Sequence, residues 1–336
     1  MNAISNLEGT AVLVTGGTGF IGSHLVEALI NRGCRVHCIV RKSSNLKWLP
    51  TQNITLHETD ITNPELPDDC LNEIQHVFHC AGLTSAKTRQ DYFEVNADAC
   101  RALFELLIPH ADHLNSIIHL SSLAAIGPSP NPPDPVNDET PCHPVTHYGK
   151  SKLAGEKIAL EYCERLPMVV IRPPVVYGER EQNFFSYLQK LKQGWRIQVG
   201  NEPRHLSIVN VHDLVKAILL AAESPEKENP VYLVTDGEVY SWEEVSRIAS
   251  NILNVNPRKL TLPLSLIRFA GMVSEMKGAL LNQPAFLDRQ RVKDIRQLAW
   301  TASADKFFNA YDFRPEYSLE RGLKITLDWY KEKGWL

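Results

Sequence analysis

Tyr148 and Lys152 lie four residues apart within residues 146–156, which read THYGKSKLAGE. On an α-helix, residues four apart lie on the same face, so the phenol and the ammonium can reach one small volume. A nearby positive charge favours the phenolate, which predicts a pKa for Tyr148 lowered from about 10 toward neutrality. We therefore expect Tyr148 to act as a general acid or base. The alternative is an exposed helix with a half-buried tyrosine, because pairs at this spacing are common.

Three glycines, Gly16, Gly19 and Gly22, follow the apolar run 11–14 and open a helical pattern. A strand, a glycine-rich turn and a helix form the context in which parallel sheets bind dinucleotides. Gly16 permits the tight turn, Gly19 lets the backbone approach a pyrophosphate, and Gly22 lets the helix pack closely on the sheet. A turn without a ligand is the alternative interpretation.

Two serines, Ser121 and Ser122, follow the predicted strand 116–120. Open α/β sheets bind their ligands at the carboxyl ends of the strands, so these hydroxyls are placed to contact a ligand. The connection 128–147 contains seven prolines, which predict a stiff, extended loop over the same edge of the sheet.

These three stretches together resemble the extended branch of the short-chain dehydrogenase/reductase family, and the resemblance covers nearly the whole chain. It implies an α/β fold in which a doubly wound, parallel Rossmann sheet is joined to a smaller, mainly helical C-terminal substrate domain. It also implies proton transfer by Ser122, Tyr148 and Lys152, with Ser121 as a structural neighbour and Lys152 bonded to the nicotinamide ribose. The family pattern after the catalytic hydroxyl ends in Tyr-Gly, whereas this chain has Ile126 before Gly127, so one contact near the substrate is absent.

The resemblance further implies which residues contact the cofactor. They are Gly16, Thr18, Gly19, Phe20, Ile21 and Gly22 in the first turn, Asp60 and Ile61 beside the adenine, Ala81, Gly82 and Asn96 after the fourth strand, Tyr148 and Lys152, and Pro174 and Val175 beside the nicotinamide. For Asp60, capping of a turn is the alternative role. For Asn96, the family implies a supporting bond to the backbone beside the cofactor.

Arg41 and Lys42 follow the second predicted strand, 35–40, where an acidic residue would bind the adenosine ribose hydroxyls. A guanidinium and an ammonium suit a phosphate dianion instead, so the sequence predicts NADP(H), with NAD(H) as the second choice. The alternative is that both charges belong to a solvated loop.

The 336 residues are 43% hydrophobic and 22% charged, with a net charge of -4. This charge indicates no basic surface for nucleic acid or an anionic membrane, so a small-molecule substrate is the expected partner. Seven cysteines with scattered spacing fit neither a disulfide framework nor a zinc site, so we predict no metal and a cytoplasmic location. The start of the chain shows no signal peptide, and the most apolar stretch, 260–281, carries three charged residues, so no membrane span is expected.

We assign residues 1–177 and 206–236 to the dinucleotide-binding domain, and residues 178–205 and 237–336 to the substrate-binding domain. Residues 262–281 form either an apolar lid or, as we expect, a packing helix of the smaller domain. Asp213 is expected to cap a helix. Family members often dimerise through two helices, here 92–107 and 148–165, so a homodimer is also expected.

Hydride transfer between a nicotinamide and a carbonyl or alcohol substrate is the function that these features favour. Sugar-nucleotide epimerisation is the first alternative, and a dinucleotide-sensing protein that has lost catalysis is the second. Retention of Ser122, Tyr148 and Lys152 argues against the sensor. Dehydration ranks last, because Leu123 and Ala124 stand where dehydratases usually carry an Asp-Glu pair.

Overall fold

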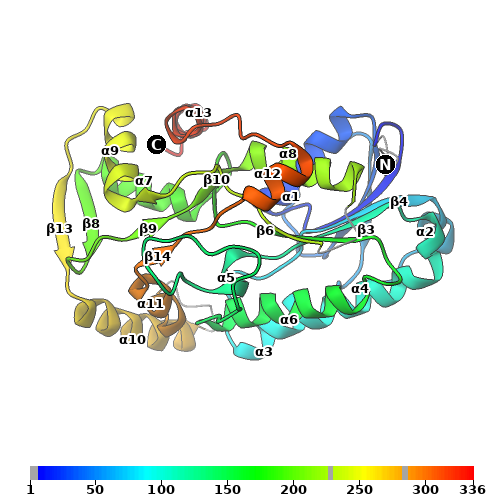
Figure 1. Cartoon of the computed structure of the whole chain (residues 1–336), viewed down its shortest axis with the longest axis horizontal. Coiled ribbons are helices and arrows are strands. Elements are labelled where there is room, and N and C mark those ends of the chain that lie inside the picture. Colours follow the sequence, from blue (N-terminus) through cyan, green and yellow to red (C-terminus); the bar gives the residue numbers. More distant parts are fainter. Residues whose placement is uncertain (1–6, 226–229, 282–286) are drawn as a thin grey trace.

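The computed structural model describes residues 7–225, 230–281 and 287–336. The first residues, where no signal peptide is expected, lie outside these ranges. Seven strands form the central sheet in the order β11-β6-β5-β4-β1-β2-β3, and every pairing in it is parallel (Figure 1). The strands are β1 (Ala11–Thr15), β2 (Arg35–Val40), β3 (Ile54–Glu58), β4 (Ile74–His79), β5 (Ser116–Leu120), β6 (Met168–Arg172) and β11 (Val231–Leu233). The predicted doubly wound parallel sheet is therefore confirmed.

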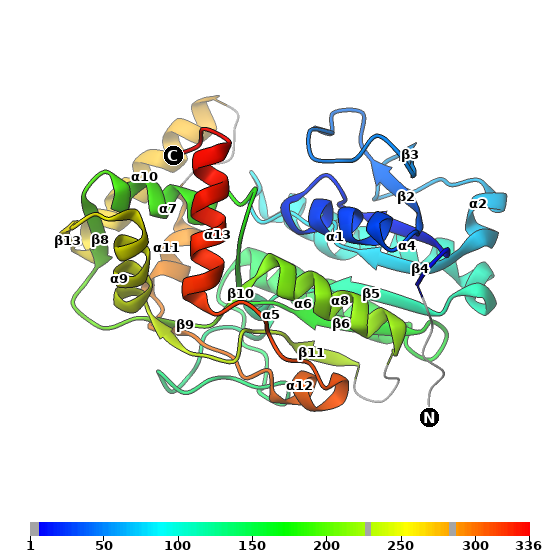
Figure 2. The same cartoon turned by 90° about the horizontal axis from the view of Figure 1, so that it is seen from above.

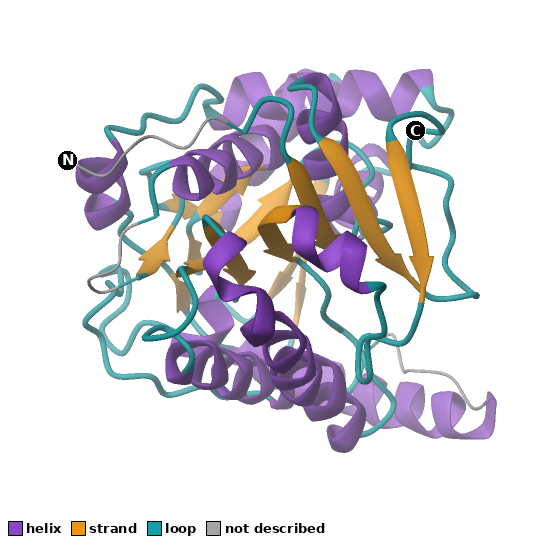
Figure 3. Cartoon of the chain, turned by 90° about the vertical axis from the view of Figure 1, so that its right-hand side faces the viewer, coloured by secondary structure: helices purple, strands orange, loops and turns teal. Residues whose placement is uncertain are grey.

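Helices cover both faces of this sheet, as the view of Figure 3 also shows. On one face lie α1 (Phe20–Asn31) and α8 (Val211–Glu223), and on the other lie α4 (Ala99–Leu107) and α6 (His147–Glu161) (Figure 1). Successive side chains of β1 enter different cores: Val12 and Val14 pack under α1 and α8, whereas Leu13 packs under α4. This alternation is what a strand buried on both faces requires, and it explains why the strand reads as an unbroken apolar run.

The helix predicted over residues 92–107 is interrupted. α3 (Arg89–Phe93) is followed by a π-helical turn, η1 (Glu94–Asp98), and only then by α4. The backbone of this turn lies against α6, where a Cβ added to Gly155 would lie 2.0 Å from the carbonyl oxygen of Asn96. The close approach of η1 to α6 therefore depends on the absence of a side chain at Gly155. π-Helical turns are frequent at functional sites.

β8 (Trp195–Val199) and β13 (Arg258–Leu262) form a parallel pair that we did not predict. Helices α7 (Asn183–Lys192), α9 (Trp242–Leu253) and α13 (Leu319–Glu332) enclose a separate apolar core. Helices α10 (Leu264–Leu281) and α11 (Arg289–Arg296) pack against each other. β8, β13, α7, α9, α10 and α11 gather at the opposite end of the molecule from β3 (Figures 1 and 2). Within the described ranges, no helix combines the length and apolarity needed to cross a membrane.

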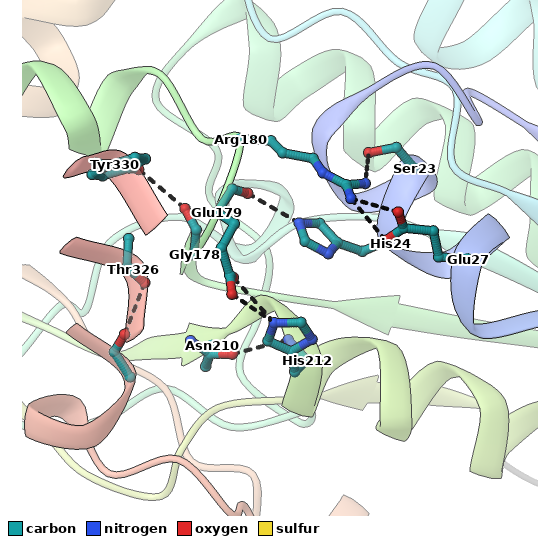
Figure 4. Close-up of polar contacts among 11 residues, drawn as sticks. Ser23, His24, Glu27, Gly178, Glu179, Arg180, Asn210, His212, Thr326 and Tyr330 are labelled. Atoms are coloured by element: carbon teal, nitrogen blue, oxygen red, sulfur yellow. Dashed lines mark hydrogen bonds and ion pairs between the residues drawn. The ribbon is translucent and has the colours of Figure 1, made fainter. Parts of the chain in front are cut away.

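The segment 178–181 joins three helices where the chain leaves the sheet after β7 (Val175–Tyr177). Arg180 adopts a φ of +72°, and its guanidinium donates to Ser23 and to both carboxylate oxygens of Glu27 on α1 (Figure 4). The Glu179 carboxylate contacts His212 Nε2 of α8 at 3.0 and 3.1 Å. The Tyr330 hydroxyl of α13 donates to the carbonyl oxygen of Gly178 at 3.0 Å. These contacts hold the dinucleotide-side helices and the C-terminal helix in one arrangement.

The role predicted for Asp213 is wrong. The residue that caps α8 is Asn210, whose side chain accepts a hydrogen bond from the backbone N–H of His212. Asp213 lies inside the first turn, and its carboxylate accepts bonds from the backbone N–H groups of Glu316 and Tyr317. It therefore anchors the segment that leads into α13.

Candidate active site

The turn after β1 has the shape that a dinucleotide pyrophosphate requires. Gly16 has a φ of +71°, and a Cβ added there would lie 2.6 Å from the backbone nitrogen of Ala81. A Cβ on Gly22 would lie 2.1 Å from the carbonyl oxygen of Gly16. Among the described residues, no side chain caps the start of α1 at Gly19, so its first N–H groups point out of the helix end as anion donors. The predicted turn residues therefore fit the group expected there.

Ser122 and Tyr148 are brought together from two separate segments. Ser122, the second residue after β5, is the N-cap of α5 (Leu123–Ile126), and its hydroxyl accepts a bond from Ala124 N at 3.1 Å. Tyr148 occupies the first turn of α6, which begins at His147 behind the N-cap Thr146. Both side chains line one cavity. Two oxygens thus converge at the carboxyl end of β5, as the sequence predicted.

Lys152 is buried one turn further along α6, with 4% of its surface exposed. Its ammonium donates a hydrogen bond to the carbonyl oxygen of Leu120 at 2.6 Å. A Cβ added to Gly82 would lie 3.6 Å from Lys152 Nζ and 3.1 Å from Asn96 Oδ1. The lysine therefore reaches the residues after β4 that were predicted to contact the cofactor.

The predicted fall in the pKa of Tyr148 is wrong for this structure. Burial raises the pKa of Tyr148 above its usual value, and Asp294 and Tyr92 raise it further, while the Ser122 hydroxyl lowers it. Burial also lowers the pKa of Lys152. The physical reason is that removal from water disfavours both charged forms, and the ammonium is directed at the Leu120 carbonyl. Tyr148 is therefore held as the neutral phenol.

Asn96 makes the backbone bonds that the resemblance implies. Its Oδ1 accepts from Leu83 N at 2.7 Å, and its Nδ2 donates to Leu83 O at 3.0 Å and to Ser151 Oγ at 2.9 Å. The side chain is 1% exposed and occupies the π-helical turn η1. Asn96 therefore fixes the loop after β4 to helix α6.

A buried ion pair beneath the site escaped the sequence analysis. Glu156 of α6 and Arg172 at the end of β6 have side chains 2% and 6% exposed and form a salt bridge. Arg172 Nε donates to Glu156 Oε2 at 2.8 Å, and the same oxygen accepts from Ser121 Oγ at 2.9 Å. Ser121 therefore has the structural role that we expected for it. Ser121, Glu156 and Arg172 could not be grouped from sequence, because they come from three separate segments.

At the adenosine end, Arg41 and Lys42 are exposed on the loop after β2. Asp60 uses Oδ1 to accept bonds from the backbone and side chain of Thr62, each at 2.9 Å. These bonds lower the pKa of Asp60, with a smaller contribution from Arg41 nearby. Asp60 therefore has the turn-capping role given as its alternative, and an adenine contact stays a prediction. Ile61 beside it is buried.

A cavity of about 750 Å³ opens from Tyr148 and Ser122 toward the C-terminal elements. Pro174 and Val175 line it near the sheet. Its further walls carry aromatic and aliphatic side chains, including Tyr187, Ile197, Val199, Trp242, Ile295 and Trp300. Asp294 of α11 also lines it, and burial followed by the nearby Asp288 raises the pKa of Asp294 to about 7. No motif marks Asp294, so the sequence analysis missed it.

Residues 12–235 match the family model described as the NAD dependent epimerase/dehydratase family, and the chain belongs to that family. It is 26% identical over 325 residues to a ceramide reductase of Caulobacter vibrioides, covering 97% of this chain and 96% of that protein. It is also 26% identical to a decarboxylating sterol-4-alpha-carboxylate 3-dehydrogenase of Dictyostelium discoideum, covering 78% of this chain and 84% of that protein.

Among solved structures, the UDP-N-acetylglucosamine 4-epimerase of Methanobrevibacter ruminantium M1 has a TM-score of 0.78 at 24% identity, covering 97% of this chain and 99% of the other. This likeness confirms the fold. Family membership confirms the predicted class, an enzyme of the extended short-chain dehydrogenase/reductase type that depends on a nicotinamide dinucleotide.

Proposed function

We propose that this enzyme reduces a carbonyl group on a lipid-like substrate, with NADPH as the hydride donor. The observation that carries the proposal is that Ser122 and Tyr148 together line a large cavity whose other walls include aromatic and aliphatic side chains. Apolar walls of this kind suit a hydrophobic substrate. The names of the ceramide reductase and the sterol dehydrogenase, which are similar to this chain over most of its length, support the same substrate class.

Three side chains perform the proton chemistry in this proposal. The Ser122 hydroxyl donates a hydrogen bond to the substrate carbonyl oxygen, and Tyr148 transfers its phenolic proton to the same oxygen as the alcohol forms. The bound nicotinamide supplies the hydride to the carbonyl carbon. The neutral phenol is the form of Tyr148 that carries the proton to be donated. With the cofactor bound, Lys152 would hold the nicotinamide ribose, and its positive charge would favour the phenolate left after proton transfer.

The glycine turn and the start of α1 would hold the pyrophosphate of the dinucleotide. Ala81, Gly82 and Asn96, together with Pro174 and Val175, would border its nicotinamide side. The preference for NADPH comes from Arg41 and Lys42, whose charges suit a 2′-phosphate. Their exposure on the loop after β2 leaves them free to turn toward such a group.

The domain assignment is part of the proposal. Residues 1–177 and 206–236 bind the dinucleotide, and residues 178–205 and 237–336 select the substrate. The cavity supports this division, because most of its walls beyond Ser122 and Tyr148 come from the second set. We further propose a homodimer formed through the helices α4 and α6.

Sugar-nucleotide epimerisation is the second candidate. Arg196 and Lys259 line the cavity and provide cations that could bind a diphosphate. Arg196 already forms an ion pair with Glu243, at 2.8 Å, which reduces the charge offered to a ligand. Because of this ion pair, we rank sugar-nucleotide epimerisation below carbonyl reduction.

A substrate panel tests the proposal. The purified enzyme is incubated with NADPH or NADH and with long-chain 3-oxo sphingolipids, 3-oxosteroids, short water-soluble ketones and UDP-sugars. We expect oxidation of NADPH with the lipid ketones. Conversion of a UDP-sugar to its epimer without net oxidation of the cofactor would instead establish the second candidate.

A further inference from the structure

Helix α10 turns its large apolar side chains outward. Phe269, Met276 and Leu280 are 60%, 73% and 86% exposed, and Leu266, Met272 and Val273 are exposed with them. Successive helix residues are rotated by 100°, so these six positions fall within one continuous arc of the helix. α10 packs against α11, as expected of a packing helix, but a packing helix or a lid would direct such an arc inward, and this arc is exposed.

The opposite side of α10, which also carries the half-buried Leu264 and Ile267, attaches the helix to the protein through small and polar residues. Gly271 and Gly278 are buried, and a Cβ on Gly271 would lie 3.1 Å from Val292 of α11. Ser274 Oγ accepts a bond from Leu287 N at 3.2 Å, and Glu275 forms an ion pair with Arg289 at 2.9 Å. These contacts fix the rotation of the helix, so its apolar arc faces away from the body.

Basic residues border this arc. Arg268 and Lys277 are exposed and, at 100° per residue, lie at its two edges. Residues 258–296 contain eight basic and three acidic residues, in a chain with a net charge of -4. The segment that carries the apolar arc is therefore net positive, in contrast to the net negative charge of the whole chain.

The same surface continues toward the cavity. Ile197 of β8 and Leu260 of β13 are paired across the two strands and are each 40% exposed. Ile197, Lys259 and Ile295 also line the cavity. In Figures 1 and 2, α10 lies at the periphery of the molecule beside the end of β13. The exposed strand pair beside α10 therefore forms part of the cavity wall.

We propose that α10, with the exposed edge of β8 and β13, docks on the surface of an anionic phospholipid bilayer. The apolar arc enters the boundary between headgroups and acyl chains, and Arg268 and Lys277 extend along it to pair with lipid phosphates. The charged residues within α10 keep it in the plane of the surface. This inference depends on the exposed surface alone and stands independently of the substrate proposed above.

Vesicle sedimentation tests the proposal with the full-length protein. The vesicles are made of phosphatidylcholine alone or of phosphatidylcholine mixed with phosphatidylglycerol. We expect the protein to bind the mixed vesicles more tightly than vesicles of phosphatidylcholine alone. Its binding to the mixed vesicles should fall as salt is added. The double variant Phe269→Ser with Met276→Ser is expected to bind at least about tenfold more weakly, as is Arg268→Glu with Lys277→Glu.

A matched control replaces two exposed leucines on the dinucleotide side, Leu46→Ser with Leu56→Ser, and should bind vesicles like the wild type. NADPH affinity measured for each variant separates loss of docking from loss of folding. Equal binding by the wild type and both α10 variants would overturn the proposal. The proposal would also be overturned if this face joins two copies of the chain. In that case the wild-type protein would be a dimer and the Phe269→Ser with Met276→Ser variant a monomer in sedimentation analysis, and the wild-type protein would not bind the vesicles.

Discussion

The ammonium of Lys152 donates a hydrogen bond to the carbonyl oxygen of Leu120 at 2.6 Å. Leu120 ends strand β5, and the serine pair follows directly, so this bond ties the helix that carries Tyr148 to the strand end that carries Ser122. It holds the ammonium beside Gly82 and Asn96. The lysine thus fixes the geometry of the site as well as its charge.

Replacement of this lysine should affect two properties together. In Lys152→Met, we expect the dissociation constant for NADPH to rise at least about tenfold, since hydrogen bonds from a charged group contribute about 1.5–3 kcal/mol. Turnover should fall as well. Fluorescence titration of NADPH measures the first effect. The exposed Lys150 of the same helix supplies the control Lys150→Met, and an unchanged NADPH affinity in Lys152→Met would reject the ribose contact.

The pair Arg41 and Lys42 is expected to select the phosphorylated cofactor. In the double variant Arg41→Ala with Lys42→Ala, the dissociation constant for NADPH should rise at least about tenfold, while that for NADH should stay near its wild-type value. Lys47→Ala, in the same exposed connection, serves as the control. Equal affinities for NADPH and NADH in the wild type would show that these charges do not bind the 2′-phosphate.

The ion pair of Glu156 and Arg172 should contribute strongly to stability. Glu156→Gln leaves a buried guanidinium without its countercharge, and breaking such a pair typically costs about 3–5 kcal/mol. Urea unfolding measures the loss in the free energy of unfolding. Glu161 lies on the same helix as Glu156 and forms an exposed pair with Arg101 of α4. Glu161→Gln breaks this pair and should cost less than about 1 kcal/mol. Similar losses in the two variants would contradict the importance assigned to the buried pair.

The contact between Glu179 and His212 should make stability depend on pH. The hydrogen bond with Glu179 raises the pKa of His212 above 6.5. The contribution of the charged His212 to the free energy of unfolding is therefore present below pH 6.5 and is lost as pH rises through the folded pKa. The pKa of Glu179 lies below 4.5: burial raises it, but the bond with His212 and the charge of that ring outweigh burial. The contribution of Glu179 is therefore present above 4.5 and is lost as pH falls through the lowered value.

Both groups are therefore charged between pH 4.5 and 6.5. Glu179→Gln should lower the free energy of unfolding by about 1 kcal/mol in this window and by less near pH 9, after allowance for the partial exposure of His212. Urea unfolding at the two pH values checks the difference. Glu316→Gln, which breaks an exposed pair with Lys216, is the control and should show no such pH dependence. An equal loss for Glu179→Gln at both pH values would contradict the ion pair.

The sheet and the central pair could be predicted because their signals are local. Gly16, Gly19 and Gly22 specify a turn within one short segment, and the four-residue spacing of Tyr148 and Lys152 directly determines a shared helix face. The pKa of Tyr148 was predicted in the wrong direction because it depends on burial by distant segments and on the Leu120 carbonyl that engages Lys152.

The features that the sequence did not disclose come from long-range contacts. β8 and β13 pair across about sixty residues of chain, and Asp294 enters the cavity from α11. The spacing of the apolar residues of α10 predicts an apolar face on the helix, but it does not predict the direction in which that face points. Which way that face points depends on Gly271 and Gly278, whose packing against the protein only the structure reveals.

The central claim is that the Tyr148 phenol transfers the proton to the substrate oxygen. Its most direct test is the turnover of Tyr148→Phe with the ketone that wild-type enzyme reduces fastest, measured as NADPH oxidation alongside the NADPH dissociation constant. The account predicts a fall in turnover of at least about a hundredfold with cofactor affinity near that of the wild type. A Tyr148→Phe enzyme that turns over at the wild-type rate would contradict it.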